Sequence, residues 1–534
     1  MRKLYYGGDI ITMVNETDAP EALVVEDGKI CFVGDYNEAE KVCGADVEKV
    51  DLQGKTLMPS FIDGHSHLSM YSQFSAFPDA SGCGSFEEIA DFVEKCIREK
   101  GLTEKDVLLV TGYDHNFLQE EAHPTRDILD KASGKVPVYL YHSSGHMGVI
   151  NTAMMELAGL SEDAKDPEGG HYGRYEDGKF NGYLEELAAF APVLMKVFER
   201  IPMDQAKQLL DVQDIYLKYG ITTVQDGSTS PQVLEGFKQM AQAGLFRVDV
   251  VAYPMFNEKP EELYTANPEY AGKYSGRLKI AGSKIFLDGS PQGKSAWLSK
   301  PYEGEESYCG YPTQKDEVIV EAAKTAIQNG FQILAHCNGD AACGQYIRCY
   351  KTAMEELGSN GDDLRPVMIH CQTVRKDQLE EMAEIGMIPS IFVAHTYYWG
   401  DVHLKNLGKE RGERISPVKT ALDLGLKYNF HQDCPVLAPD MMKTVWCAVN
   451  RITRKGVVIG EKERITVFDA LKGITINAAY AYHEEKEKGT LESGKLADMV
   501  ILESNPLKTK PENLADIAVL ETIKEGVTLY RKEK

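Results

Sequence analysis

The feature that most constrains the fold is a series of eight apolar, strand-like runs that alternate with amphipathic segments through the middle of the chain. The runs, in order, are TLMPSFIDGHSH, GITTVQDG, FRVDVVAYP, KIAGSKIFLDG, FQILAHCNGD, RPVMIHCQ, GMIPSIFVAH and LKYNFHQDCP. Amphipathic segments such as KDEVIVEAAKTAIQNG, before the fifth run, have the pattern of helices that cover a sheet. Parallel strands buried on both faces read as continuous apolar runs, so the series predicts an α/β fold, a closed (β/α)8 TIM barrel. A doubly wound open sheet is the alternative.

The two ends of the chain share a second pattern. ALVVEDGKICFVG near the start and KGTLESGKLADMVILESNP near the finish are apolar strands around Gly-containing turns, which is typical of hairpins. Neither end has enough apolar residues for its own core. We therefore expect residues 1–58 and 487–534 to form one small β-sandwich, with the barrel, residues 59–486, inserted between its halves. The first and second runs are too far apart for a simple connection, so residues about 75–210 are expected to form an α/β insertion over the barrel mouth.

Charge and cysteine usage disfavour several classes of partner and location. The formal net charge of −24 would repel nucleic acid and an anionic membrane surface. The N-terminal apolar stretch is broken by Gly7, Gly8 and Asp9, unlike a signal peptide, and no run approaches the ~18–20 apolar residues of a membrane span. Eleven cysteines without a CxxC pair fit a reducing compartment. We expect a cytoplasmic protein with a small-molecule substrate and no nucleic-acid or membrane partner, and a homodimer stays open.

Polar residues follow the predicted barrel strands at the ends where barrel active sites lie. In chain order they are His65, His67, Lys284, His336, His370, His395 and Asp433. Side chains at i and i+2 of a strand share a face, so the HxH of the first run is a candidate metal ligand pair. For an isolated HxH, a solvated or hydrogen-bonded pair is the competing interpretation. Single histidines on the fifth and sixth runs are commonly core residues, but as a pair opposite an HxH they are better explained as ligands.

Asp433 and Lys284 extend this set. A carboxylate after the apolar run of Asp433 is costly to bury unless it is paired, and a dication is the partner we expect; an N-cap of the following helix is the alternative. Lys284 cannot ligate a cation while it is protonated. If its amine reacts with carbon dioxide, the resulting carbamate is an anionic ligand that can bridge two metal ions. An ion pair with Asp288 is the alternative for Lys284.

In this order, these residues resemble the amidohydrolase superfamily over essentially the whole chain. The closest branch is similar to the N-substituted formamide deformylases, on the segments KIFLDGSPQGKSAWLSKPY, AHCNGDAA and SSGHMGVINTAMM. The resemblance implies one or two divalent ions, with zinc expected, held by His65, His67, Lys284 as its carbamate, His336, His370 and Asp433. It also implies a metal-dependent hydrolase that cleaves a non-peptide C–N bond of a small N-acyl or N-formyl compound.

Further residues have expected roles in that reaction. Metal-activated hydroxide would attack the carbonyl, with Asp433 as proton shuttle and His395 as hydrogen-bond donor to the oxyanion. Four substrate-binding candidates complete the set: His146, Tyr113, Asp114 and Trp297.

Three alternative functions are kept open. A deaminase on the same fold is disfavoured because Asp340, and not Glu, follows the strand-five His336. Lactone or ester hydrolysis uses the same hydroxide. A non-catalytic regulatory protein with a structural metal is disfavoured because structural zinc sites usually close with four ligands, often cysteines.

Overall fold

The computed structural model describes residues 2–44, 46–167, 169–201, 204–359 and 363–533. The chain divides into two compact units. The first unit comprises Met1–Ser69, Leu210–Cys434 and Ala438–Lys534, and the second comprises Met70–Leu209 and Pro435–Leu437. Each unit has its own sheets and core.

Two parallel sheets of the first unit hold the strand runs predicted for the barrel. One has the order β15-β14-β13-β7 and the other β16-β17-β18-β19-β20. Their bounds are β7 (Phe61–Ile62), β13 (Ile221–Thr229), β14 (Asp249–Pro254), β15 (Leu278–Ile280), β16 (Gly282–Phe286), β17 (Gln332–Cys337), β18 (Val367–His370), β19 (Ile388–Ile391) and β20 (Asn429–Phe430). Backbone hydrogen bonds also link the two sheets: Ala281 N–H donates to Ala252 O (3.0 Å) and Gly64 N–H donates to Phe430 O (3.2 Å).

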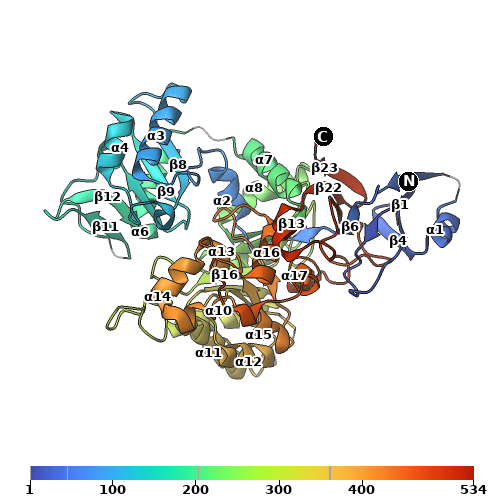
Figure 1. Ribbon diagram of the computed structural model, residues 1–534. Helices are drawn as coiled ribbons and strands as arrows, with labels where there is room; N and C mark the ends of the chain where they lie inside the picture. Colours follow the sequence, from blue (N-terminus) through green and yellow to red (C-terminus); the bar gives the residue numbers. More distant parts are fainter. Residues whose placement is uncertain (1, 45, 168, 202–203, 360–362, 534) are drawn as a thin grey trace. The chain divides into compact units, whose positions relative to one another are not determined.

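Helices follow most of these strands, and α10, α11 and α12 lie together beside β16 (Figure 1). Local sequence explains where they start: Ser230 caps α8 by accepting a hydrogen bond from Val233 N (3.2 Å), with Pro231 in the first turn. The bounds are α8 (Pro231–Gln242), α9 (Pro260–Ala266), α10 (Asp316–Asn329), α11 (Asp340–Leu357), α12 (Lys376–Glu384), α13 (His395–Tyr398), α14 (Gly400–Gly412), α15 (Val418–Asp423), α16 (Met441–Asn450), α17 (Val467–Gly473) and α18 (Ile476–Ala481). Helices α2 (Leu68–Phe74) and α7 (Gln205–Lys218) cross the boundary between the units.

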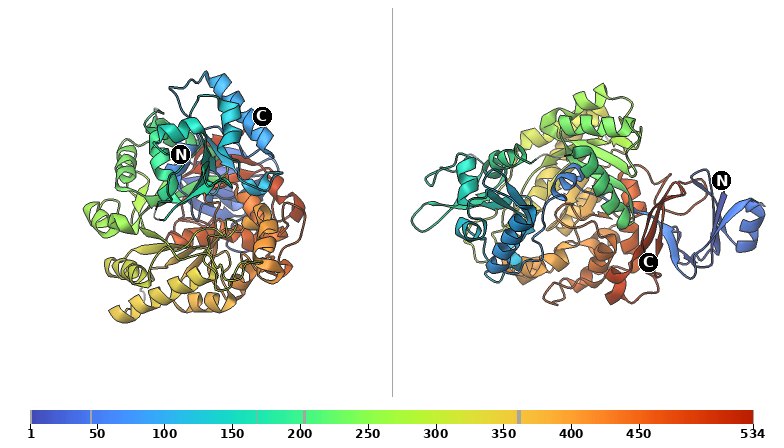
Figure 2. Two further views of the ribbon diagram at one scale, coloured as in Figure 1. Left: turned by 90° about the vertical axis from the view of Figure 1, so that its left-hand side faces the viewer. Right: turned by 90° about the horizontal axis from the view of Figure 1, so that it is seen from above.

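Two further sheets of the first unit use the ends of the chain. The first, of order β4-β3-β1-β5, and the second, of order β2-β6-β21-β22-β23, share an apolar cluster that includes Leu23, Leu57 and Met499. Strand β6 pairs with β21, so the red C-terminal strands run beside a blue N-terminal one (Figure 2). The bounds are β1 (Arg2–Tyr6), β2 (Asp9–Ile10), β3 (Ala22–Glu26), β4 (Lys29–Gly34), α1 (Tyr36–Cys43), β5 (Val47–Asp51), β6 (Thr56–Pro59), β21 (Met499–Leu502), β22 (Val519–Lys524) and β23 (Val527–Arg531).

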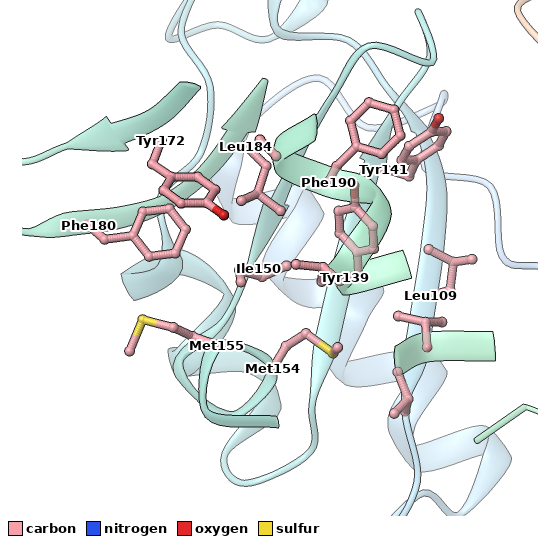
Figure 3. Close-up of a cluster of buried hydrophobic side chains, with 14 of the residues drawn as sticks. Leu109, Tyr139, Tyr141, Ile150, Met154, Met155, Tyr172, Phe180, Leu184 and Phe190 are labelled. Carbon is pink, nitrogen blue, oxygen red and sulfur yellow. The ribbon is translucent and has the colours of Figure 1, made fainter. Parts of the chain in front are cut away.

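The second unit is a five-stranded sheet of order β11-β12-β10-β9-β8, and two apolar clusters pack it against helical residues. Alternate residues of β9 enter different cores: Tyr139 and Tyr141 join the cluster drawn in Figure 3, and Val138 and Leu140 join the cluster on the other face. The bounds are α3 (Phe86–Lys100), β8 (Leu108–Tyr113), η1 (His115–Phe117), α4 (Arg126–Ser133), β9 (Val138–His142), β10 (Met147–Ile150), α5 (Thr152–Leu157), β11 (His171–Arg174), β12 (Phe180–Glu185) and α6 (Leu187–Phe198).

Local structure differs from the sequence expectation at three of the eight runs. The first run splits into β6 and β7, which belong to different sheets. The fourth splits into β15 and β16 at Ala281. In the seventh, β19 ends at Ile391 and His395 begins a short helix, so His395 does not end a strand as expected. Among the described residues, no helix combines the length and the apolar character that crossing a membrane requires.

Candidate metal centre

Four of the predicted metal ligands meet around one carboxylate in the first unit. Oδ1 of Asp433 lies 3.4 Å from Nε2 of His65 and 3.4 Å from Nε2 of His67, and Oδ2 lies 3.8 Å from Nε2 of His370. Nζ of Lys284 lies 3.1 Å from Nε2 of His65. One ligand atom each of His65, His370 and Asp433 lie within 4.8 Å of one another. We call His65, His67, Lys284, His370 and Asp433 the first-unit centre.

The HxH reaches this centre by a bend and not by a strand. Strand β7 ends at Ile62, and His65 lies in a bend three residues further on. Gly64 is needed here, because a Cβ at that position would lie 2.7 Å from Phe430 O. His67 then makes an isolated antiparallel bridge with Asp226. Both rings still face Asp433, although the strand geometry assumed for HxH does not apply.

Each histidine of the centre has a polar neighbour at its other ring nitrogen, Nδ1. The side chain of Gln225 contacts Nδ1 of His65, Ser228 Oγ lies 3.0 Å from Nδ1 of His67, and His431 Nε2 lies 3.2 Å from Nδ1 of His370. Metal-ligating histidines are held in this way, with Nε2 left for the ion.

The burial and hydrogen bonding of the Asp433 carboxylate indicate whether this site suits a cation. Its Oδ1 is buried and accepts no hydrogen bond from the residues that the structure describes. A buried carboxylate oxygen without a hydrogen-bond donor, facing imidazole nitrogens, fits a divalent ion.

Burial also governs the other titratable groups of the centre. It lowers the pKa of His65 and of His370 well below the usual value, so both rings are uncharged and have a lone pair for a cation. Burial lowers the pKa of Lys284 to about 7, against the opposing charge of Asp433. The alternative ion pair of Lys284 with Asp288 is not among the contacts that the structure records; Nζ of Lys284 contacts His65 instead.

His336 lies at the edge of this centre and is held by Asp288. Its ring centroid is 4.5 Å from that of His370, and its Nδ1 is 3.2 Å from Asp288 Oδ1. Asp288 also accepts backbone hydrogen bonds from Asn338 (3.0 Å), Gly339 (2.7 Å) and Trp297 (3.0 Å). This buried carboxylate therefore fixes the end of β17 and the loop that contains Trp297, the half-buried predicted substrate contact.

Two residues of the centre have a backbone conformation that favours glycine or asparagine. The φ angle is 76° at His370 and 55° at Asp433. Non-glycine residues in this region cluster at functional sites, where the surrounding structure compensates for the strain. His370 ends β18, and Asp433 lies three residues after the end of β20, so the backbone turns close to the ends of these short parallel strands.

His395 is buried near the first-unit centre. The structure records no hydrogen bond between His395 and a residue of that centre. Its Nδ1 lies 3.0 Å from Nε2 of His403, and its ring packs on Phe392 and Trp399, each at a centroid distance of 4.6 Å. Burial lowers its pKa well below the usual value, and the charge of Asp433 opposes that shift. The role of His395 in the reaction stays a prediction.

Three predicted substrate contacts, Tyr113, Asp114 and His146, belong to the second unit. His146 Nδ1 lies 3.1 Å from Glu186 Oε2. Tyr113 and Asp114 adjoin a group of histidines in that unit, described below. Their predicted contact with substrate stays a prediction.

His431 was missed by the sequence analysis. It is fully buried, and its ring centroid lies 5.4 Å from His65 and 5.2 Å from His370. Its Nδ1 lies 3.0 Å from Ser390 Oγ. A signal existed, because His431 and Asp433 form an HxD at the end of the eighth run, with the spacing of the HxH. Gln225 and Ser228 gave no comparable signal.

A match to a protein-family model identifies the family of this chain. The model of the amidohydrolase family matches residues 48–530. The chain belongs to the amidohydrolase family. This confirms the resemblance drawn from the ligand pattern.

Amidohydrolase relatives match along the whole chain. The Bacillus subtilis protein YtcJ is 26% identical, with 100% of each chain covered. The N-substituted formamide deformylase of Arthrobacter pascens is 25% identical, over 98% of this chain and 97% of the relative. An uncharacterized metal-dependent hydrolase from Pyrococcus horikoshii OT3 is similar in structure, with a TM-score of 0.76, 26% identity, and 96% and 99% of the two chains covered. These amidohydrolase relatives imply a TIM-barrel-like α/β fold and a metal-dependent hydrolase.

Proposed function

We propose that the chain hydrolyses a non-peptide C–N bond of a small N-acyl or N-formyl compound, using one or two divalent ions held at the first-unit centre. The observation that carries this proposal is the buried Asp433 carboxylate, whose Oδ1 faces His65 and His67 and accepts no hydrogen bond in the described chain. The deformylase relative supports C–N bond cleavage. We also propose that the two parallel sheets form one closed barrel, supported by the hydrogen bonds between them.

His65, His67, His370 and Asp433 would hold an ion, with His336 beside them and zinc as the expected metal. The ion would supply a Lewis acid that lowers the pKa of water towards ~7 and polarises a carbonyl. The carbamate of Lys284 is part of the proposal: Nζ attacks the carbon of carbon dioxide, an N–C bond forms and one proton leaves. Burial lowers the pKa of Lys284 to about 7 against the charge of Asp433, and this favours the neutral amine that the step needs.

The residues of the chain then handle protons and orientation. Asp433 takes a proton from the attacking water at a carboxylate oxygen. As the C–N bond breaks, Asp433 returns that proton to the leaving nitrogen, and the products are an amine and a carboxylic acid. His395 donates a hydrogen bond to the carbonyl oxygen as charge develops there. Trp297 contributes to the wall that receives the substrate.

A substrate panel tests the proposal. The full-length protein is loaded with zinc and assayed on N-formyl, N-acyl and carbamoyl compounds, with carboxylic esters and lactones alongside. We expect turnover of at least one C–N compound, loss of turnover with a chelator and recovery with added zinc. Turnover of esters alone would replace the amide assignment by esterase activity. Metal-loaded protein with no turnover on either class would favour a non-catalytic role.

A further inference from the structure

A second group of potential metal ligands lies in the second unit. Strands β8 and β9 are parallel, so their carboxyl ends meet at one edge of the sheet, where Tyr113 pairs with His142. Asp114 and His115 directly follow β8, and His123 arrives from the loop before α4. We call His115, His123 and His142 the histidine cluster.

The atoms of this cluster have the spacing of metal ligands. Nδ1 of His115 lies 3.1 Å from Nε2 of His142, and Asp114 Oδ1 lies 3.8 Å from the first and 3.6 Å from the second. One nitrogen from each of the three rings lies within 4.8 Å of the others. Four ligands at 2.0–2.1 Å around a tetrahedral ion are about 3.3 Å apart. The separations also match those of the first-unit centre, where Asp433 lies 3.4 Å from two imidazoles.

Burial makes this group suitable for a cation. The side chains of His142 and Asp114 are 0% and 2% exposed, and that of His115 is 16% exposed. A dication would offset the charge of the Asp114 carboxylate in these buried surroundings.

Neighbouring groups already orient the ligands. Tyr113 Oη lies 3.1 Å from Nδ1 of His123, and Asn116 donates to Asp114 Oδ1 from both its backbone N and its Nδ2, each at 2.9 Å. Ser144 Oγ lies 2.9 Å from Nδ1 of His142. The contacts at Nδ1 of His123 and of His142 lie on the far side of each ring from an ion bound at Nε2 and fix the orientation of the ring. Asn116 holds the Asp114 oxygen that faces the histidines.

We propose that the histidine cluster, with Asp114 as fourth ligand, binds one first-row divalent ion of the zinc type. The set is closed by four protein ligands, so the ion is structural: it fastens the segment 114–123 to the end of β9. Asp114 and Tyr113 then support a metal, in place of the substrate contact expected from sequence. This proposal does not depend on the proposed hydrolytic function.

The competing arrangement is a network of hydrogen bonds without an ion. Ser144 N–H donates to Nδ1 of His142 (3.0 Å), so in the ion-free protein the ring proton is on Nε2 and is donated to Nδ1 of His115. When the ion binds, that proton must move to Nδ1, where Ser144 Oγ accepts it. His142 thereby loses the hydrogen bond that it accepts from Ser144 N–H and the one that it donates to His115, and both rings gain a metal–nitrogen bond. The two arrangements differ in metal content.

Zinc analysis of the full-length chain separates the two arrangements. The background is a variant with His65→Ala, His67→Ala and Asp433→Ala, in which the first-unit centre can no longer hold an ion. After dialysis against zinc, we expect this background to retain one zinc per chain, and addition of His123→Ala to remove it. The matched control, His171→Ala, changes an exposed histidine of the same unit and should retain the zinc. Equal zinc content with and without His123→Ala would overturn the proposal.

A milder variant covers the case in which His123→Ala does not fold. Asp114→Asn keeps the shape of the fourth ligand and removes its charge. In the same background, competition with a chromophoric chelator should show at least tenfold weaker zinc binding, and substituted Co²⁺ should lose intensity in its tetrahedral visible bands. Unchanged affinity and an unchanged Co²⁺ spectrum would show that Asp114 is not a ligand and would overturn the four-ligand site.

Discussion

The side-chain amide of Gln225 holds the ring of His65 in one tautomer. Tyr482 O–H donates to Asp63 O (2.6 Å), so the hydroxyl oxygen of Tyr482 accepts from Nε2 of Gln225 (2.9 Å). The other hydrogen of Nε2 points to Gly64 O (3.2 Å). Both amide hydrogens are therefore committed, and Oε1 of Gln225 must face Nδ1 of His65 as an acceptor. His65 has its proton on Nδ1, and Nε2 presents a lone pair towards Asp433.

Removing this acceptor should weaken metal binding at the first-unit centre. We expect Gln225→Leu to lower zinc affinity about 10- to 100-fold, the range typical for partners that orient a metal-bound histidine. Competition with a chelator measures the change. Gln239→Leu, on the exposed face of α8, is the control and should leave affinity unchanged. If Gln225→Leu binds zinc as tightly as the wild type, the ring of His65 does not need this amide.

Asp433→Asn should separate metal binding from proton transfer. Asparagine retains one oxygen but cannot accept and return the proton, so we expect zinc content to stay largely intact and kcat/KM to fall about 10²- to 10⁴-fold. Asp423→Asn, exposed at the end of α15, should have wild-type activity. Wild-type turnover by a zinc-loaded Asp433→Asn protein would contradict the shuttle.

Acid should destabilise the first unit through Glu484. This buried carboxylate pairs with Lys279 and, at 2.8 Å, with Lys488, and these partners lower its pKa to about 2 against the opposing effect of burial. Relative to a pKa of ~4.3 in the unfolded chain, this shift contributes about 3 kcal/mol to the free energy of unfolding. The contribution is fully present above pH ~4.3 and is lost as the pH falls towards 2.

Glu484→Gln tests this contribution. We expect the variant to be less stable than the wild type by about 3 kcal/mol at pH 6, and the difference to shrink as the pH approaches 2. Urea unfolding at several pH values gives both quantities. Glu487→Gln, at an exposed position nearby, should follow the wild-type curve. A difference that stays constant with pH would exclude ionisation of Glu484 as its source.

Gly339 should tolerate no side chain. A Cβ there would lie 1.8 Å from Trp297 O, a backbone atom. We expect Gly339→Ala to destabilise the protein by about 1–3 kcal/mol and to weaken zinc binding, since Asp288 binds Gly339 N–H and orients His336. Gly236→Ala in α8, where a Cβ has open space, should be neutral or stabilising. Wild-type stability and zinc affinity in Gly339→Ala would show that this loop can move.

The sequence predicted which polar side chains meet, because apolar runs end in these residues; their role as metal ligands stays a prediction. His65, His67, His370 and Asp433 meet as expected, although a bend and positive φ angles, not strand alternation, direct them. The residues that contact Nδ1 of these histidines could not be predicted. Gln225 reaches His65 only through the pairing of β13 with β7, a long-range register that the local pattern does not contain.

The histidines of the second unit show the same limit. His115 and His142 became neighbours through the parallel pairing of β8 and β9, and His123 through the course of a loop. In the sequence they are three separate residues of the expected insertion, and the candidates named there, Tyr113, Asp114 and His146, were assigned to substrate binding and not to a metal. Their spacing along the chain matches no common ligand motif.

The left-handed backbone at His370 and Asp433 also limits how this protein can change over evolution. Asparagine, aspartate, histidine and glycine accept such a conformation at small cost, whereas valine or isoleucine would strain the main chain. Lineages that lose the catalytic activity should therefore first acquire Asn or Gly at these two positions, because both residues keep the backbone conformation and hence the fold. A descendant of this kind would keep its shape and could be recruited as a binding protein.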